Sequence, residues 1–322
     1  MIEKSKSLFS GKVISICSSD IWVEIQKEVY SCTIKGSLKK TRLNTDNLVV
    51  VGDNVKISRN SSYTGVIEEI EQRFNFLSRG ISQNKYHVMV ANVDLILIVV
   101  TLDNFSQNLI DRYIVMSLKG NILPVIIVNK WDLDVLEEEK EEVEKTIRYY
   151  ESLGMQVFKT SCLSLVGISE LKTFTKNKIN MFLGQSGVGK TSLFNQLTGK
   201  NYSVQTTNKK TGKGLHTTTR STLISTQDGW FVDSPGIRFF SLYAIRPIEL
   251  QEFFVEIANE AEFCRYSSCS HNHEPECAVK LAVQEGRISK KRLESYYILL
   301  EEIKAKTKRK ERIFISRQKK KD

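Results

Sequence analysis

The glycine-rich run at residues 184–191, GQSGVGKT, constrains the fold of this chain more than any other feature. It matches the pattern G-x-x-x-x-G-K-[ST] and lies between a strand-like stretch at 179–183 and a helical stretch at 191–197. Such a loop curls backbone N–H groups around phosphate oxygens at the positive end of a helix. Lys190 then neutralises phosphate charge, and Thr191 offers a hydroxyl to Mg²⁺. The run therefore predicts a P-loop inside an α/β domain.

A second motif indicates which base the nucleotide carries. Residues 129–132, NKWD, follow the apolar stretch 122–128 and match the pattern N-K-x-D. The carboxylate of Asp132 can accept hydrogen bonds from N1–H and N2–H₂ of guanine, whereas adenine would leave it unpaired. Alone, the tetrapeptide could be an ordinary turn, but beside a P-loop it predicts specificity for GTP. Residues 160–162, TSC, resemble the loop whose backbone supports guanine O6.

Two further segments have the pattern of nucleotide-sensing switches. Residues 233–236, DSPG, match D-x-x-G, which places Asp233 in the outer shell of Mg²⁺ and the N–H of Gly236 toward the γ-phosphate. Residues 214–219, GLHTTT, supply threonines for a first switch that orders when triphosphate and Mg²⁺ bind. We assign Thr218 to Mg²⁺, although the sequence leaves open which of the three threonines binds it.

The residue that positions the attacking water is not in its usual place. Many GTPases carry a glutamine shortly after D-x-x-G, but here Ile237 and Arg238 follow Gly236. We predict that His216 is catalytic, because its ring could position or deprotonate water. The alternative is a loop histidine that contacts RNA or solvent. Arg238 or Arg220 could stabilise transition-state charge, and the sequence selects neither.

The order of these motifs along the chain is unusual. Base recognition comes first, followed by base support, the P-loop and the two switches, whereas ordinary GTPases place the P-loop first. This order predicts a circular permutation. The second switch then leads straight into the C-terminal region, so loss of the γ-phosphate can pull on a domain attached there.

A cluster of soft ligands near the C-terminus predicts a structural zinc site. Three of the six cysteines lie within fourteen residues, and a histidine lies among them. Three thiolates and one imidazole suit a closed tetrahedral site, and the cluster favours metal over disulfides. The alternatives are free buried thiols with a surface histidine, or His273 as a poorer ligand. The predicted zinc ligands are Cys264, Cys269, His271 and Cys277.

These patterns predict a multidomain chain. Residues 1–75 alternate short β-like runs with turn residues, which fits an N-terminal OB-like β-barrel, although periodicity alone does not separate the OB fold from other small barrels. We predict that this barrel binds RNA. Residues 76–245 alternate buried strands with helices and hold the motifs of a central, circularly permuted α/β P-loop GTPase. Residues 246–322 predict a C-terminal, mainly helical zinc-binding domain with a basic tail.

The charge of the chain is concentrated in that tail. Of the net charge of +10, most comes from residues 303–322, which hold ten Lys or Arg against two acids. The tail could be a solvated terminus, bind nucleic acid through counterion release, or bind anionic lipid. The longest apolar stretch, 95–100, is too short to span a membrane, and the N-terminus does not resemble a signal peptide. We therefore expect a cytoplasmic protein.

The combination of motifs resembles the RsgA family, also called YjeQ, of GTPases that depend on the small ribosomal subunit. The resemblance covers nearly the whole chain: the barrel, the permuted motifs with G-x-H-T-T-T, and a C-x4-C-x-H-x5-C cluster. It implies that the small subunit stimulates slow GTP hydrolysis and that the protein acts in late subunit maturation. In that family the histidine at the position of His216 is a proposed catalytic residue.

We therefore predict a GTPase that binds GTP or GDP, the small ribosomal subunit and its rRNA, does not bind membranes, and is a monomer. Its cofactors are one structural Zn²⁺, and Mg²⁺ bound with GTP through Thr191, Thr218 and Asp233. A rival hypothesis is an RNA-binding assembly scaffold with little hydrolytic role; an ATP-dependent kinase or ATPase is disfavoured by Asp132. The predicted nucleotide-binding residues are Asn129, Lys130, Asp132, Ser161, Cys162, Gly184, Gln185, Ser186, Gly187, Val188, Gly189, Lys190, Thr191, Ser192, Asp233 and Gly236.

Overall fold

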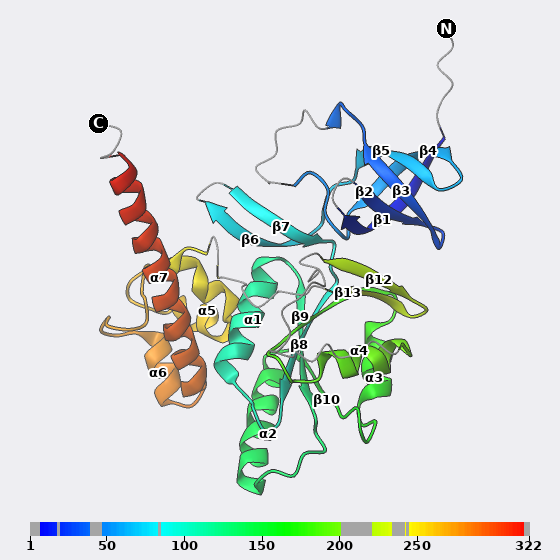
Figure 1. The fold of residues 1–322 in the computed structure, drawn as a ribbon. Coiled ribbons are helices and arrows are strands. Elements are labelled where there is room, and N and C mark those ends of the chain that lie inside the picture. The colour runs from blue at the N-terminus through cyan, green and yellow to red at the C-terminus, as the bar shows by residue number, and fades with distance from the viewer. Residues whose placement is uncertain are drawn as a thin grey trace, which may run out of the picture.

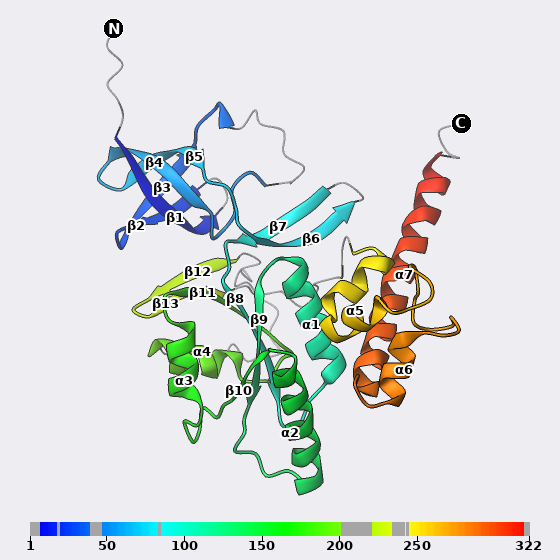
Figure 2. The same cartoon turned by 180° about the vertical axis from the view of Figure 1, so that it is seen from behind.

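The computed structural model describes residues 7–17, 20–38, 47–82, 85–200, 221–233, 242 and 245–318. Within these ranges the chain forms a barrel, a central sheet flanked by helices, and a group of C-terminal helices (Figure 1). The C-terminal helices lie beside the central helices on the side away from the barrel, as the reverse view also shows (Figure 2). None of the helices in the described ranges combines the length and apolarity needed to cross a bilayer.

Alternation of buried and exposed residues produces the N-terminal barrel. Its strands pair in the order β1-β2-β3-β5-β4, and β4 returns to β1 and closes the sheet. Strands β3 and β5 run parallel, and the other pairs are antiparallel. The predicted OB-like barrel is thus confirmed. The strands are β1 (Leu8–Cys17), β2 (Asp20–Ile25), β3 (Glu28–Ile34), β4 (Asn54–Ser61) and β5 (Thr64–Ile70).

The central sheet is mainly parallel, as the apolar runs predicted. Its order is β10-β9-β8-β11-β13-β12, with only β12 antiparallel to its neighbour β13. All seven residues of β8 are buried, which is expected for a strand covered on both faces. The strands are β8 (Leu95–Thr101), β9 (Leu123–Asn129), β10 (Gln156–Lys159), β11 (Lys178–Leu183), β12 (Thr222–Thr226) and β13 (Gly229–Asp233).

Helices cover both faces of this sheet. Along β8, Ile96 and Ile98 pack into one core, whereas Leu95 and Leu97 pack into a second core on the other face. This alternation follows from the two-residue period of a strand. The first core contains residues of α1 (Gln107–Lys119), α2 (Glu137–Ser152) and the C-terminal helices described below. The second contains residues of α3 (Ile168–Thr175) and α4 (Lys190–Thr198).

The barrel and the central sheet are hydrogen-bonded to each other. Strand β12 pairs with β1 of the barrel at Thr222 and Ser15, so the central strands and the barrel strands form one continuous sheet. A hairpin that the sequence analysis missed, β6 (Phe76–Ser82) and β7 (Lys85–Ala91), follows the barrel and forms its own two-stranded sheet. Figure 1 shows this hairpin between the barrel and α1.

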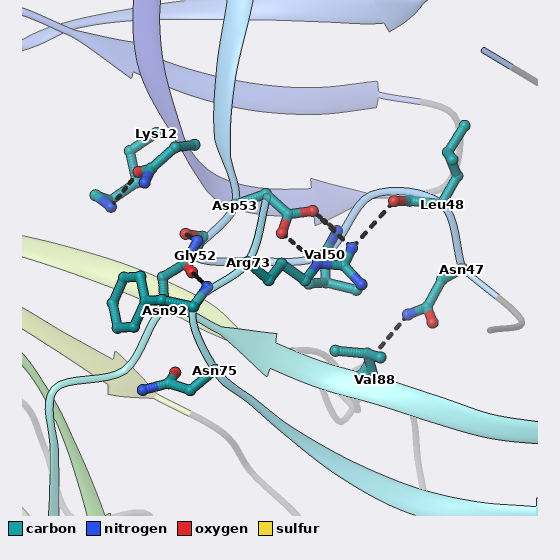
Figure 3. Close-up of polar contacts among 12 residues, drawn as sticks. Lys12, Asn47, Leu48, Val50, Gly52, Asp53, Arg73, Asn75, Val88 and Asn92 are labelled. Atoms are coloured by element: carbon teal, nitrogen blue, oxygen red, sulfur yellow. Dashed lines mark hydrogen bonds and ion pairs between the residues drawn. The ribbon is translucent and has the colours of Figure 1, made fainter. Parts of the chain in front are cut away.

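Buried polar side chains fasten this junction (Figure 3). Asp53, which is 0% exposed, accepts hydrogen bonds from Nε and a terminal nitrogen of Arg73 at 2.7 and 2.9 Å. Nδ2 of Asn92 donates to the carbonyl of Gly52 at 3.0 Å, and Oδ1 of Asn92 accepts from the N–H of Phe74 at 3.1 Å. Three segments are therefore held together: the barrel, the connection after β5, and the entry to β8.

Substitution of Gly52 by alanine is expected to loosen the junction and lower the free energy of unfolding by about 2–4 kcal/mol. Gly52 has φ +91°, and a Cβ there would lie 2.0 Å from the carbonyl oxygen of Ala91. Urea unfolding measures the change. Gly36→Ala is the control, because a Cβ at Gly36 meets no atom within 4 Å. Equal stability of both variants would contradict this reading of the junction.

The C-terminal part is helical, as predicted, but its first helix is not continuous. The sequence of residues 248–262 predicts a single helix. The structure instead has a 3₁₀ helix, η3 (Pro247–Phe253), which ends at Phe254, and then α5 (Val255–Ala261). Phe254 is fully buried and packs edge-on against Tyr296, with ring centroids 5.6 Å apart. This tertiary contact overrides helix continuity. Two more helices follow, α6 (Ala278–Gln284) and α7 (Lys290–Gln318).

A buried charge network joins these helices to the central domain. Arg292 of α7, 1% exposed, pairs with Asp111 of α1 and, at 2.6 Å, with Glu256 of α5. The hydroxyl of Tyr150, from α2, also donates to Asp111. Burial raises the pKa of Asp111 despite the nearby guanidinium. Four helices therefore meet at one desolvated guanidinium.

Candidate nucleotide site and metal centre

The predicted P-loop connects β11 to α4. It requires glycine at Gly189, where φ is +91° and a Cβ would lie 2.3 Å from Nδ2 of Asn129. The amine of Lys190, the first residue of α4, donates to the carbonyls of Gly184 at 2.9 Å and Gln185 at 2.6 Å. The lysine therefore lies over the loop, and the loop opens at the N-terminal end of a helix, where anions are favoured.

The remaining loop residues differ in exposure. Gln185, Ser186 and Gly187 are exposed at the tip, whereas Val188 is buried beneath them. In the first turn of α4, Thr191 is half-buried and Ser192 is exposed. The tip of the loop and the start of the helix are thus open to solvent, and the buried Val188 attaches the loop to the protein interior.

The base-recognition motif is attached directly to this loop. Asn129, 1% exposed at the end of β9, donates through Nδ2 to the carbonyl of Val188 at 2.9 Å. Its Oδ1 accepts from the hydroxyl of Thr160 at 3.1 Å. One buried amide therefore connects the three motifs that the sequence placed at residues 129–132, 160–162 and 184–191.

Asp132 lies in the exposed part of the same edge. It is exposed, and Lys130 before it has a positive φ of 57°. Two backbone bonds hold the loop around it, from Trp131 N–H to Thr160 O and from Leu133 N–H to Lys130 O, both at 3.0 Å. The carboxylate is therefore presented to solvent from a fixed turn.

The residues expected to support the base have different surroundings. Ser161 is fully buried, and its hydroxyl accepts the N–H groups of Leu163 and Ser164 at 3.1 and 3.0 Å, so its side chain closes a turn. Cys162 is half-buried, and burial together with the charge of Asp132 raises its pKa. Ser161 thus closes a turn of the loop, whereas the Cys162 thiol is under the influence of the Asp132 charge.

Topology explains why these motifs meet. Parallel strands present their carboxyl ends at one edge, and Thr101 of β8 is in register with Asn129 of β9. The sequence analysis missed Asn104, which follows β8 and donates to Oε1 of Gln185 at 3.1 Å. Its position just after a buried strand was the available signal.

Part of the predicted site lies outside the described residues. This applies to His216, Thr218 and Gly236. Asp233 is described only as the last backbone position of β13, one step beyond the parallel pair Met181–Val232. The backbone of Asp233 is thus at the same sheet edge as the P-loop.

The cysteine cluster has dimensions that suit one metal ion. Nδ1 of His271 lies 3.6 Å from Sγ of Cys264 and 3.5 Å from Sγ of Cys277, and the two sulfurs are 3.8 Å apart. All four donor atoms, including Sγ of Cys269, lie within 4.8 Å of one another. Tetrahedral bonds of about 2.3 Å to sulfur and about 2.0 Å to nitrogen require separations of about 3.5–3.8 Å. The cluster can therefore hold a metal ion such as zinc.

Burial favours the neutral forms of Cys269, His271 and Cys277. Burial raises the pKa of the Cys269 thiol to about 12, and it also raises the pKa of Cys277. Burial lowers the pKa of His271, which leaves a lone pair on the imidazole. Metal binding would displace the thiol protons and supply the missing countercharge. His273 is exposed and does not belong to the cluster.

Two family models and several curated relatives match this chain. The family model described as "RsgA GTPase" matches residues 70–243, and one described as "50S ribosome-binding GTPase" matches residues 180–316. The chain is 35% identical to the "Small ribosomal subunit biogenesis GTPase RsgA" of Chlorobaculum tepidum over 92% of its own length and 99% of that protein.

Two solved structures share the whole architecture. YjeQ from Thermotoga maritima is 32% identical, with a TM-score of 0.75 over 92% of this chain and 99% of that one. YloQ, described as a circularly permuted GTPase, is 25% identical, with a TM-score of 0.74 over 95% and 98% of the two chains. The predicted permutation is confirmed.

Proposed function

Because this chain belongs to the RsgA family of GTPases, we propose that it hydrolyses GTP in the service of small ribosomal subunit maturation. The observation that carries the enzymatic part is the buried amide of Asn129, which holds the base-recognition strand against the P-loop. The ribosomal part is supported by the relatives' names, small ribosomal subunit biogenesis GTPase, at 92% coverage of this chain. We further propose that the small subunit stimulates hydrolysis and that the protein contacts rRNA in the cytoplasm.

The proposed roles follow from the chemistry of each side chain. Lys190 neutralises the β- and γ-phosphate oxygens, and Asp132 accepts the guanine N–H donors. Bound Mg²⁺ would screen phosphate charge, with the hydroxyls of Thr191 and Thr218 as its protein contacts and Asp233 in its outer shell. His216 would orient the attacking water once the first switch is ordered.

We also propose the division of labour among the parts. Residues 1–75 contact rRNA, residues 76–245 bind and hydrolyse the nucleotide, and residues 246–322 form a zinc-stabilised helical domain. The whole protein acts as a monomer. The zinc is structural, because three thiolates and one imidazole leave no open position for a substrate.

The test is GTP turnover by the purified chain with Mg²⁺, alone and with isolated small or large ribosomal subunits. We expect stimulation by small subunits only, and we expect His216→Ala to lower the stimulated rate about 10²-fold or more. Stimulation by large subunits only would favour the partner named in the second family model. The absence of any stimulation would favour the scaffold hypothesis.

A further inference from the structure

The histidine of the metal-binding cluster has a partner outside the cluster. Nε2 of His271 lies 3.0 Å from Oε1 of Gln251, whereas Nδ1 faces the sulfurs of Cys264 and Cys277. Gln251 belongs to η3 and is half-buried. The two ring nitrogens therefore have partners from different segments of the chain.

The chemistry of imidazole makes this arrangement directional. A neutral ring carries one N–H and one lone pair, and a metal can bind only the nitrogen with the lone pair. If Nδ1 binds the ion, Nε2 must carry the proton and donate it to an acceptor. Oε1 of Gln251 is that acceptor, and His271 is 0% exposed, so bulk water does not reach the ring.

The rest of His271 is held by a different element. The hydroxyl of Tyr297 in α7 donates to the carbonyl of His271, and the ring centroids of Tyr296 and His271 are 5.9 Å apart. The backbone of His271 adopts a positive φ of 61°, so it is held in a turn that few residues favour. Helix α7 thus holds the backbone of His271 and places an aromatic ring beside the imidazole, whereas Gln251 contacts the ring nitrogen that faces away from the sulfurs.

We propose that Gln251 is a positioning residue of the metal centre, whose Oε1 accepts Nε2–H of His271 and so holds Nδ1 toward the ion. This rests on the proposed metal binding by the cluster. A consequence follows from linkage: if η3 favours metal binding, bound metal stabilises the position of η3 by the same free energy. Since η3 follows β13 and the D-x-x-G segment, the metal centre stabilises the first described helix beyond the second switch motif.

The experiment compares three variants of the full chain. Gln251→Leu removes the acceptor with little change in volume, and Gln251→Glu keeps an acceptor and strengthens it. Gln284→Leu, at an exposed position of α6, is the matched control. The measurements are the rate at which zinc-loaded protein releases Zn²⁺ to a coloured chelator, and the visible spectrum of the Co²⁺-loaded protein.

We expect Gln251→Leu to release zinc about 10- to 100-fold faster than the wild type and to alter the Co²⁺ spectrum. Gln251→Glu should release zinc no faster than the wild type, and Gln284→Leu should match it. The proposal would be overturned if Gln251→Leu released zinc at the wild-type rate. It would also be overturned if Gln251→Leu and Gln251→Glu released zinc equally fast.

The variants also guard against misfolding. Circular dichroism and GTP binding show whether Gln251→Leu still folds. If it does not fold, Gln251→Glu alone tests the acceptor role. Fast zinc release from a folded Gln251→Glu would refute that role. A wild-type chain that binds neither Zn²⁺ nor Co²⁺ would refute the metal centre itself, whereas the ribosome-stimulated GTP hydrolysis is tested separately.

Discussion

Replacement of Asp132 by asparagine is expected to weaken GTP binding about 10²- to 10⁴-fold and to create affinity for xanthosine triphosphate. Guanine presents two donors, N1–H and N2–H₂, which a carboxylate accepts together. An asparagine amide would direct its own N–H₂ at the guanine N2–H₂, so one donor on each side would lose its partner. Xanthine carries a carbonyl at C2, which accepts that amide donor.

The surrounding structure indicates that this substitution changes the hydrogen-bonding groups and not the conformation of the turn. Asp132 is exposed, and backbone bonds on both sides hold its turn, from Trp131 to Thr160 and from Leu133 to Lys130. The asparagine should therefore occupy the same place. Fluorescence titration with labelled GTP and xanthosine triphosphate measures both affinities.

The matched control is Asp134→Asn, the same substitution at an exposed position two residues further along. It should leave both affinities unchanged. If Asp132→Asn binds GTP as tightly as the wild type, the base does not contact residues 129–132, and the assignment of guanine specificity is wrong.

Replacement of Arg292 by methionine is expected to lower the free energy of unfolding by about 3–5 kcal/mol. The guanidinium is 1% exposed and lies between the carboxylates of Asp111 and Glu256, which are 0% and 7% exposed. Methionine fills similar space but leaves two desolvated carboxylates unpaired. Urea unfolding monitored by circular dichroism measures the loss.

The loss should depend on pH. Burial already raises the pKa of Asp111 in the folded protein, and removal of the guanidinium raises it further. A group whose pKa is higher in the folded than in the unfolded state binds protons on folding, so acid favours the folded variant. The destabilisation should therefore be larger near pH 8 than near pH 5.

The control for this prediction is Arg112→Met. Arg112 pairs with Glu302, and both side chains are 25% exposed, so water can solvate the remaining carboxylate. We expect a cost of about 1 kcal/mol or less. Equal costs for the two variants, or no pH dependence for Arg292→Met, would contradict a desolvated network between the domains.

Much of the candidate nucleotide site was predictable, because its motifs are short and local. Gly189 of the P-loop and the N-K-x-D tetrapeptide are recognisable without any long-range contact. Parallel strands then bring the ends that carry these motifs to one edge of the sheet. Asn104 was not predictable, since a single amide after a strand carries no pattern. Its contact with Gln185 depends on which strands are neighbours.

The C-terminal part shows the opposite balance. The spacing of the cysteines predicted a metal site, but Gln251 could not be found, because it lies twenty residues from His271 and in a different helix. The break of the predicted helix at Phe254 was also missed. Local helix propensity favoured continuity there, and packing of the buried Phe254 ring against Tyr296 outweighed it.

The sequence by itself determined which loop is proposed to hold phosphate, which carboxylate is proposed to read the base, which thiols can bind metal, and the order of motifs that makes the fold permuted. These depend on residue type and short spacing. Only the tertiary structure decided how the parts are joined, through Asp53 and Asn92 at the barrel and Arg292 at the C-terminal helices. Those contacts join residues far apart in the chain, and their strength comes from burial, which no local pattern records.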